Sequence, residues 1–205
     1  RQVYGGVFEP GSPLADEDGF REDVLAALKE LKAPIVRWPG GCYVSGYHWQ
    51  AGVGPQREPT HDMAWGVIEP NSFGTDEFVA LCRRLGWQPY VCNNAGNGTV
   101  EEMRDWVDYC NGATGKFAQM RADNGHAEPL NVQIWSIGNE IPNRHVARGA
   151  ALSAALSEYI RHLDDAGGGS RRAITSAYPG VGTDAATAAF LAPLDVAGYN
   201  YSPHG

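Results

Sequence analysis

The fold is indicated most clearly by the segment Ile134-Trp135-Ser136-Ile137-Gly138-Asn139-Glu140. Its apolar residues have the composition of a buried strand, and the run is too short for a buried helix. In a barrel, Asn139 and Glu140 would lie at the carboxyl end of this strand, where barrel enzymes hold their reacting groups. Glu140 would then be a carboxyl group that gives or takes a proton. The same pattern also fits a strand followed by a solvated turn.

Segments of strand and helix composition alternate along the rest of the chain. The predicted strands cover residues 3–8, 34–37, 89–94, a segment that starts at 131, 172–177 and 194–201. The predicted helices cover residues 19–31, a segment that starts at 75, a segment that starts at 99 and stops at 111, 146–163 and 184–191. Six β/α steps with short connections predict an α/β fold, with a parallel sheet and helices wrapped outside it.

The length of the chain bears on whether such a barrel is closed. An eight-stranded barrel typically needs ~250 residues, and this chain has 205. The sequence therefore predicts an incomplete (β/α)8 TIM-barrel type of fold, with six β/α units and with strands seven and eight absent. No linker or change of composition divides the chain, so residues 1–205 are predicted to form a single partial (β/α) barrel domain.

Capping residues and local composition add detail to the helix starts, to one connection and to one long loop. Thr75 is predicted to cap the helix that follows it, and Thr99 with Glu102 fits a capping box. The helix that starts at 99 is expected to bury Met103, Trp106, Val107 and Cys110 on one face. Residues 113–130 are expected to form a polar connection. The loop after residue 41 is long and rich in aromatic residues, which favours a functional role.

Composition and charge argue against several partners and compartments. Apolar residues make up 43 % of the chain and charged residues 20 %, which is typical of a globular protein. The net charge of −8 disfavours nucleic acid and anionic membranes as partners, and no apolar run approaches the ~20 residues of a membrane span. No signal peptide is recognisable, so the predicted compartment is the cytoplasm. Because the chain opens at Arg1, an N-terminal segment could have been removed.

No cofactor and no metal site are predicted. The sequence has no glycine-rich phosphate loop and no nicotinamide-binding fingerprint. The four cysteines form no C-x-x-C pair and have no histidine at ligand spacing beside them. They are Cys42, Cys82, Cys92 and Cys110.

Polar side chains follow almost every predicted strand. They are Glu9, Arg37, Asn93 with Asn94, Asn139 with Glu140, Tyr178, and Tyr199-Asn200-Tyr201 followed by His204. Amides and carboxylates beside aromatic rings suit a neutral polyhydroxylated ligand, which is a sugar. Glycoside hydrolysis needs a carboxyl group that protonates the leaving oxygen, and usually a second carboxylate. Arg37 ends an apolar strand and is therefore expected to pair with a carboxylate.

Aromatic residues are abundant, with six Trp and nine Tyr in the chain. Trp49 and Trp65 in the long loop are candidates for stacking on a sugar ring, although a loop packed by its own aromatics is equally ordinary. Trp38 fits either a pocket or the core. Trp135 lies inside a strand and is expected to fill the barrel.

Six motifs occur in order before residue 141. They are YGGVFEP (4–10), VRWPGGC (36–42), SGYHW (45–49), EPNSFGTDEF (69–78), YCNG (109–112) and WSIGNE (135–140). In this order they resemble the α-L-arabinofuranosidases of glycoside hydrolase family 51, from residue 4 to about residue 140. The resemblance implies a (β/α)8 barrel and a retaining, cofactor-free hydrolase that removes terminal arabinofuranosyl groups from plant polysaccharides or oligosaccharides.

The resemblance also implies roles for single residues. It makes Glu140 the general acid/base, Glu9 and Asn139 ligands of the furanose, and Arg37 a support for the catalytic carboxylates. Cys42 stands where many members have an asparagine that binds sugar, so we expect it in the pocket. Further residues at strand ends and in the long loop complete the predicted substrate-binding set: Asn94, Trp49, Tyr199, Asn200 and Tyr201.

After Glu140 the sequence changes in character. Ile141-Pro142, residues 173–177 and residues 194–201 resemble the barrel of family 2 enzymes, the β-galactosidases and β-glucuronidases. Both families share one clan of barrels and the same Asn-Glu pair. A divergent natural member, an engineered hybrid and a spliced sequence all fit this change, and a β-galactosidase or β-glucuronidase-like activity is the alternative.

The second catalytic carboxylate has no match in the chain. In both families it is a Glu at the end of the seventh strand, whereas the sixth predicted strand is the last before Gly205. We therefore predict little or no retaining activity for this polypeptide alone. A complementing C-terminal segment could supply the carboxylate. Alternatively, the chain is a non-catalytic sugar-binding or scaffold half-barrel, in which open edges at the first and sixth strands favour a homo-oligomer.

Overall fold

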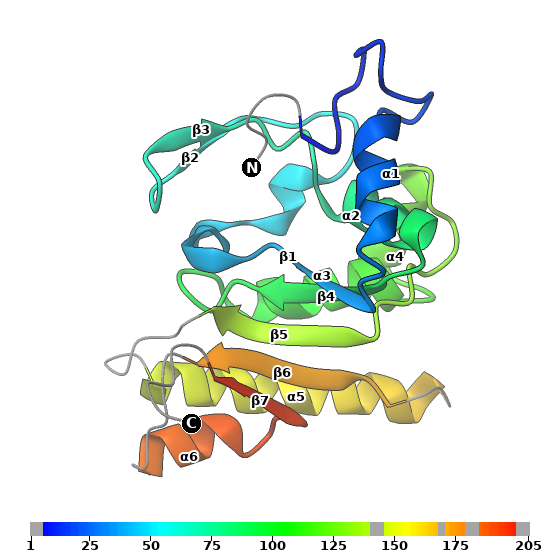
Figure 1. Cartoon of the computed structure of the whole chain (residues 1–205). Helices are drawn as coiled ribbons and strands as arrows, with labels where there is room; N and C mark the ends of the chain where they lie inside the picture. The colour runs from blue at the N-terminus through cyan, green and yellow to red at the C-terminus, as the bar shows by residue number, and fades with distance from the viewer. Residues whose placement is uncertain (1–5, 140–145, 168–170, 179–184, 200–205) are drawn as a thin grey trace.

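The computed structural model describes residues 6–139, 146–167, 171–178 and 185–199. Five strands form one parallel sheet, in the order β1-β4-β5-β6-β7 (Figure 1). These strands are β1 (Ile35–Trp38), β4 (Gln88–Asn93), β5 (Ile134–Asn139), β6 (Ala173–Tyr178) and β7 (Val196–Tyr199). Each strand of this sheet pairs with the sheet strand that follows it along the chain, which is the arrangement of part of a (β/α) barrel.

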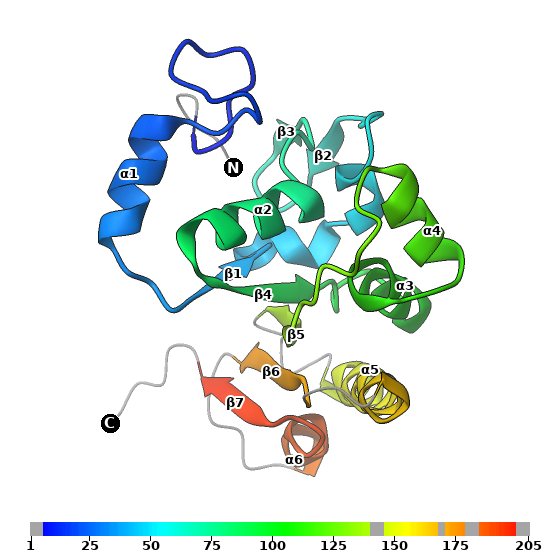
Figure 2. The same cartoon turned by 90° about the vertical axis from the view of Figure 1, so that its right-hand side faces the viewer.

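Helices connect the strands and lie outside the sheet. They are α1 (Glu22–Glu30), α2 (Thr75–Leu85), α3 (Val100–Asn111), α4 (Lys116–Asp123), α5 (Val146–Gly167) and α6 (Ala185–Leu191). In Figure 2 the sheet curves, and α2, α3, α5 and α6 follow one another along its outer side. The prediction of a parallel sheet wrapped by helices is confirmed for the described part of the chain.

The core lies between the sheet and these helices and is rich in aromatic rings. Trp135 of β5 is fully buried, as predicted for a barrel-filling residue. Its ring packs edge-on against Trp106 of α3, with ring centroids 6.2 Å apart. The predicted buried face of α3 is also confirmed, because Met103, Val107 and Cys110 are buried beside Trp106.

The first predicted strand does not join the described sheet. Residues 1–5 lie outside the description, and Phe8 forms an isolated antiparallel bridge with Phe20. The two rings meet edge-on at 5.3 Å, and the backbone N–H of Arg21 donates to the carbonyl of Val7 at 2.9 Å. The described sheet therefore has five strands, and the described part of the first predicted strand instead contacts residues 19–21.

Other elements differ from the prediction in detail. The expected polar connection contains α4, and α1 begins at Glu22 instead of residue 19. The long loop contains two 3-10 turns, η1 (Gly41–Gly46) and η2 (Trp49–Gly52), and a hairpin of β2 (Thr60–Asp62) and β3 (Val67–Glu69).

Thr75 does not cap α2. Gly74 is the N-cap residue, and its N–H donates to the Glu77 carboxylate at 2.8 Å. The Thr75 hydroxyl instead accepts from the Trp106 indole N–H at 3.0 Å. The predicted cap is wrong by one residue, because the hydroxyl satisfies a buried indole in the core.

Candidate active site

The centre of the candidate site is a contact between the ends of two strands. The guanidinium of Arg37, near the end of β1, donates from Nη2 to Oδ1 of Asn139 at the end of β5, at 3.0 Å. Asn139 is 5 % exposed. The sequence predicted a carboxylate partner for Arg37, and the described partner is an amide. With Oδ1 taken by Arg37, the Nδ2 group of Asn139 is left to donate to a ligand.

Gly138 directs Asn139 toward this contact. The register between β5 and β6 shifts between Ser136 and Asn139, and Gly138 has a φ of +73°. Such a bulge re-aims the following side chain, and only glycine takes a positive φ without steric cost. The hydroxyl of Ser136 and the thiol of Cys92 both donate to the Gly138 carbonyl, at 3.1 and 3.3 Å. Gly138 of the WSIGNE motif thus sets the backbone conformation at the end of β5.

Several predicted site residues lie at or beyond the limits of the description. Glu140 directly follows Asn139 and is outside the described residues, as are Asn200 and Tyr201. Tyr199 ends β7, but its side chain is not described. The roles assigned to these four residues stay predictions.

Asn94 follows β4 and has its amide fully engaged by the protein. Its Nδ2 donates to the carbonyl of Tyr47 at 3.1 Å and to Oδ1 of Asn97 at 2.7 Å. Its Oδ1 accepts from the backbone N–H of Gly96 at 3.0 Å. Asn94 therefore ties the loop around Tyr47 to the strand end, which fits a structural role better than the predicted contact with substrate.

Glu9 is paired with Arg21 in the described structure. Its carboxylate accepts from Nη1 of Arg21 at 3.1 Å, and its side chain is 41 % exposed. Glu9 is not among the residues that line the three cavities described next. Its role as a sugar ligand stays a prediction.

The β2–β3 hairpin borders three cavities near the strand ends. A cavity of about 800 Å³ is lined by Asn139 and by the exposed Cys42, in line with the pocket position predicted for that cysteine. A second, of about 470 Å³, is lined by Arg37, Trp38 and Glu69. A third, of about 330 Å³, includes Trp38 and the exposed Trp65. Trp38 is therefore a pocket residue.

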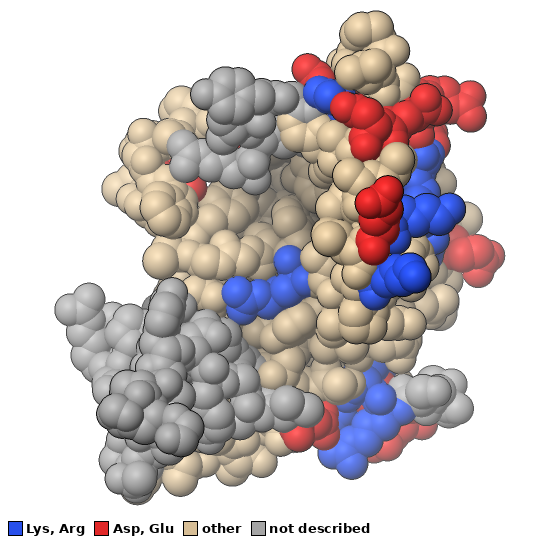
Figure 3. All heavy atoms as spheres, in the orientation of Figure 1, with Lys and Arg blue, Asp and Glu red and all other residues tan. Residues whose placement is uncertain are grey.

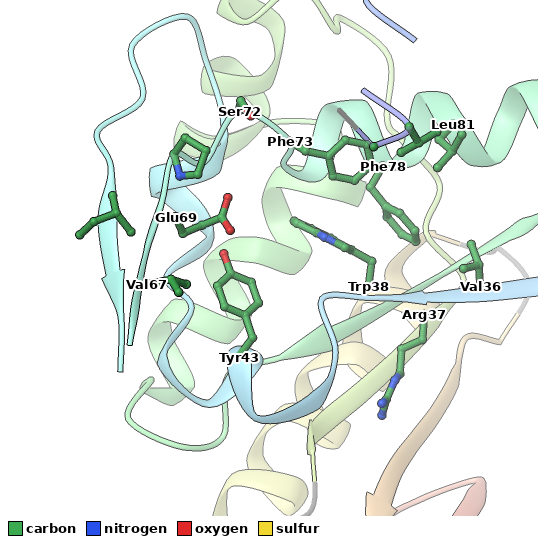
Figure 4. Close-up of a pocket in the computed structure, with 14 residues that line it drawn as sticks. Val36, Arg37, Trp38, Tyr43, Val67, Glu69, Ser72, Phe73, Phe78 and Leu81 are labelled. Carbon is green, nitrogen blue, oxygen red and sulfur yellow. The ribbon is translucent and has the colours of Figure 1, made fainter. Parts of the chain in front are cut away.

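Tyr43 and Glu69 are two of the pocket residues that the sequence analysis missed. In Figure 4 their side chains point toward one another inside the cavity, and Arg37 points to the opposite side of β1 from Trp38. Burial, followed by the nearby charges of Glu69 and Asp62, raises the pKa of Tyr43 above its ordinary value. Glu69 lies in one of the quoted motifs, but no hairpin signal marked it as a residue that faces a cavity.

Trp49 is a core residue and not a sugar platform. It is 1 % exposed, and its indole N–H donates to the carbonyl of Glu102 at 3.1 Å. Its ring stacks on Trp106 and contacts Phe117. The loop is packed by its own aromatics, which corrects the prediction that Trp49 contacts substrate.

The face around the hairpin carries few charges. In Figure 3 acidic and basic side chains gather over the N-terminal loop, α1 and α2, while the hollow beside them is bordered mainly by uncharged residues. Among the described residues, no group of three His, Cys, Asp or Glu side chains is arranged to hold a metal ion.

Fold and site together define the class of protein. A parallel β/α sheet with polar side chains at the carboxyl ends of its strands is the arrangement of a partial (β/α) barrel. The family model described as the alpha-L-arabinofuranosidase 1 domain matches residues 27–163, and the chain belongs to this family.

Curated relatives share about half of their aligned residues with this chain. The chain is 53 % identical over 144 residues to alpha-L-arabinofuranosidase C of Emericella nidulans, which covers 69 % of this chain and 29 % of that protein. It is 42 % identical over 144 residues to the intracellular exo-alpha-(1->5)-L-arabinofuranosidase of Halalkalibacterium halodurans, with the same coverage. The chain thus spans less than a third of the length of these relatives.

Solved arabinofuranosidases share the fold over almost the whole chain. An alpha-L-arabinofuranosidase from Thermotoga maritima, solved as an arabinose complex, has 39 % identity and a TM-score of 0.78, covering 96 % of this chain and 42 % of that one. The GH51 enzyme from Xanthomonas axonopodis pv. citri has 31 % identity and a TM-score of 0.82 with the same coverage. These matches take in most of the segment after residue 140, whose likeness to family 2 stays a prediction.

Proposed function

We propose that the chain is part of the catalytic barrel of a retaining α-L-arabinofuranosidase that removes terminal arabinofuranosyl groups from plant polysaccharides or oligosaccharides. One observation carries the proposal. The 3.0 Å bond between Arg37 and Asn139 joins the ends of β1 and β5 directly before Glu140. The family match and the names of the relatives support the choice of sugar.

The proposed reaction uses two carboxyl groups. Glu140 gives its proton to the glycosidic oxygen as the bond to the anomeric carbon breaks, and a second carboxylate attacks that carbon to form a glycosyl-enzyme. Glu140 then takes a proton from the water that releases the sugar. Asn139 Nδ2 donates to a hydroxyl of the furanose, and Arg37 keeps the amide in the orientation that allows this.

Sugar binding tests the proposal. We expect the chain to bind methyl α-L-arabinofuranoside in an NMR titration, and Asn139→Ala to weaken binding by about tenfold, because one hydrogen bond in a desolvated site is lost. Gln119→Ala, an exposed amide on α4, is the matched control and should bind as the wild type does. Equal affinities of Asn139→Ala and the wild type would contradict the proposal.

The source of the second carboxylate is part of the proposal. No residue of the sequence matches the nucleophile motif, so we propose that a complementing segment or partner supplies it. The pure 205-residue chain should then turn over an aryl arabinofuranoside at close to the uncatalysed rate. Measurable turnover that disappears in Glu140→Gln would show that this chain holds both carboxyl groups.

A scaffold function is the second candidate. β1 and β7 are the two ends of the described sheet, and Ile35 on β1 is 39 % exposed. Such edges can pair with another chain. A homodimer in sedimentation velocity that forms without sugar would favour this candidate, and a monomer would count against it.

For location, none of the described helices is both long and apolar enough to cross a membrane. We propose the cytoplasm as the compartment. The printed name of the Halalkalibacterium halodurans relative, an intracellular enzyme, supports this choice.

A further inference from the structure

A histidine held by a carboxylate lines the cavity that contains Asn139. Nδ1 of His48 lies 2.8 Å from Oε1 of Glu102, and the His48 side chain is 52 % exposed. Both His48 and Asn139 line the cavity of about 800 Å³. With Nδ1 bonded to the carboxylate, Nε2 is the nitrogen left for a ligand, since no described residue bonds to it. Nε2 accepts from a hydroxyl group when the ring is neutral and donates to one when it is charged.

The His48 ring is oriented by contacts within the protein before any ligand binds. The next residue, Trp49, donates from its indole N–H to the carbonyl of the same Glu102 at 3.1 Å. The Trp49 ring stacks on Trp106 at 6.2 Å with an interplanar angle of 5°. Residues 48 and 49 are therefore attached to Glu102 at two points, and the entropy of ordering the histidine is lost on folding and not on binding.

Glu102 forms only half of the predicted capping box, and its carboxylate contacts His48 instead. The sequence predicts a capping box, and one half forms, because the Glu102 N–H donates to the Thr99 hydroxyl at 3.1 Å. Its carboxylate contacts His48, and among the described contacts no bond runs from it to the Thr99 backbone N–H. The start of α3 therefore lacks the second hydrogen bond of a capping box, from the N-cap backbone N–H to the Glu102 side chain, among the described contacts. A carboxylate that orients a histidine in this way is typical of binding and catalytic sites.

The cavity around His48 suits a neutral sugar. Ser45, Thr60 and Asn97 contribute hydroxyl and amide groups to its wall. None of the described residues that line it is Lys or Arg, and Asp62 adds a negative charge. An anionic ligand would be repelled by Asp62 and would find no Lys or Arg in the described wall, whereas hydroxyl groups find both donors and acceptors.

We propose that His48 Nε2 binds a hydroxyl group of the sugar unit on the leaving-group side of the scissile bond, with Glu102 as its positioning residue. The inference rests on the proposed function, which places the arabinofuranosyl ring at Asn139 in the same cavity. His48 then determines whether the site prefers an oligosaccharide to a simple glycoside.

The test compares two ligands on the same chain. Methyl α-L-arabinofuranoside occupies one sugar position, and its α-1,5-linked disaccharide occupies two. We expect the disaccharide to bind about tenfold more tightly to the wild type, the effect of one hydrogen bond to an oriented group. His48→Phe should bring the ratio of the two Kd values close to one while the Kd of the monosaccharide changes less than about twofold.

Two further variants complete the experiment. Glu102→Gln keeps an acceptor for Nδ1 but loses the charge, so the ratio should fall partway. His162→Phe, an exposed histidine on α5, is the matched control and should keep the wild-type ratio. Thermal melting checks that each variant folds, and if His48→Phe does not, the ratio in folded Glu102→Gln decides.

Each outcome bears on one claim. An unchanged ratio in folded His48→Phe, or in folded Glu102→Gln when only that variant folds, overturns the role of His48. A wild-type ratio of one overturns it as well. Failure of the wild type to bind the monosaccharide contradicts the proposed function itself, and the assignment of His48 falls with it.

Discussion

Gly138 shows how one residue sets the direction of its neighbour. Its φ of +73° and the register shift of β5 bring Asn139 to Arg37. A side chain at this backbone conformation is strained, whatever space surrounds it. The identity of residue 138 is therefore coupled to the geometry of the site as well as to stability.

Gly138→Ala should lower the free energy of unfolding by about 1–2 kcal/mol, the cost of a left-handed conformation for a residue with a Cβ. It should also weaken arabinofuranoside binding, because Asn139 is re-aimed. Urea denaturation and the NMR titration measure the two effects. Gly46→Ala, where a Cβ meets nothing within 4 Å, is the stability control. Equal losses in the two variants would contradict this account of Gly138.

The placement of some residues was predictable from the sequence, although their roles stay predictions. Asn139 and Arg37 were expected close together, because polar residues at strand ends gather at one edge of a parallel sheet, and the two side chains are in contact. The bond from Arg37 to the amide of Asn139 was not predicted, because the sequence does not show which polar group lies within reach of the guanidinium. Trp49 was misassigned because a loop aromatic that packs inward has the same local pattern as one that faces a ligand.

The hairpin that borders the cavities is held at its base by a half-buried ion pair. The Arg57 guanidinium donates to both oxygens of Glu77, at 2.9 and 2.7 Å, and also to the carbonyl of Asn71 at 3.1 Å. The same Glu77 carboxylate accepts from the Gly74 N–H. One residue of α2 therefore anchors the hairpin and starts the helix.

Glu77→Ala should cost about 2–4 kcal/mol of stability, because it leaves the Arg57 charge partly buried without its partner and removes the cap of α2. Chemical denaturation measures the loss. Glu128→Ala, an exposed glutamate after α4, is the control and should change stability by less than about 0.5 kcal/mol. A Glu77→Ala variant as stable as this control would refute the anchoring role.

Asp76 links α2 to α3 and introduces a pH dependence. Its carboxylate accepts from the Tyr109 hydroxyl at 3.0 and 2.9 Å. Burial raises the pKa of Asp76 above its ordinary 3.8, against the opposing effects of Tyr109 and His126. The folded chain thus holds this proton more tightly than the unfolded chain does. Stability is lost as the pH rises from about 3.8 through the raised pKa, and the loss is complete above it.

Asp76→Asn should remove this dependence. The free energy of unfolding of the wild type, measured relative to Asp76→Asn by urea denaturation, should fall as the pH rises from about 4 to 7. Asp165→Asn, an exposed acid on α5, serves as the matched control. A difference that stays constant, or that grows with pH, would contradict the raised pKa.

Elements with a strong hydrophobic period were predictable, and elements defined by turns were not. The stripe of α3 and the apolar run of β5 predict their elements because burial imposes the period. The β2–β3 hairpin has strands of only three residues, and Ile68 on β3 is 65 % exposed, so no period marks it. α4 was missed because it has only eight residues, follows Gly115 and lies within a mostly polar segment.

At the scale of the whole molecule, the order of the sheet follows from β/α alternation, and the predicted parallel topology is observed over five strands. The position of residues 6–21 could not be predicted in the same way, because it depends on the contact between Phe8 and Phe20. The choice of sugar came from ordered motifs and the family match, and general physical patterns do not separate one neutral sugar from another.

The most direct test of the central claim is a comparison of three ligands on the wild-type chain by NMR. Methyl α-L-arabinofuranoside, methyl β-D-galactoside and methyl β-D-glucuronide are titrated in parallel, with the Arg37 and Asn139 signals as probes of the site. We expect the arabinofuranoside alone to bind and to shift both signals. Tighter binding of the galactoside or the glucuronide, or arabinofuranoside binding that leaves both signals unmoved, would contradict the account.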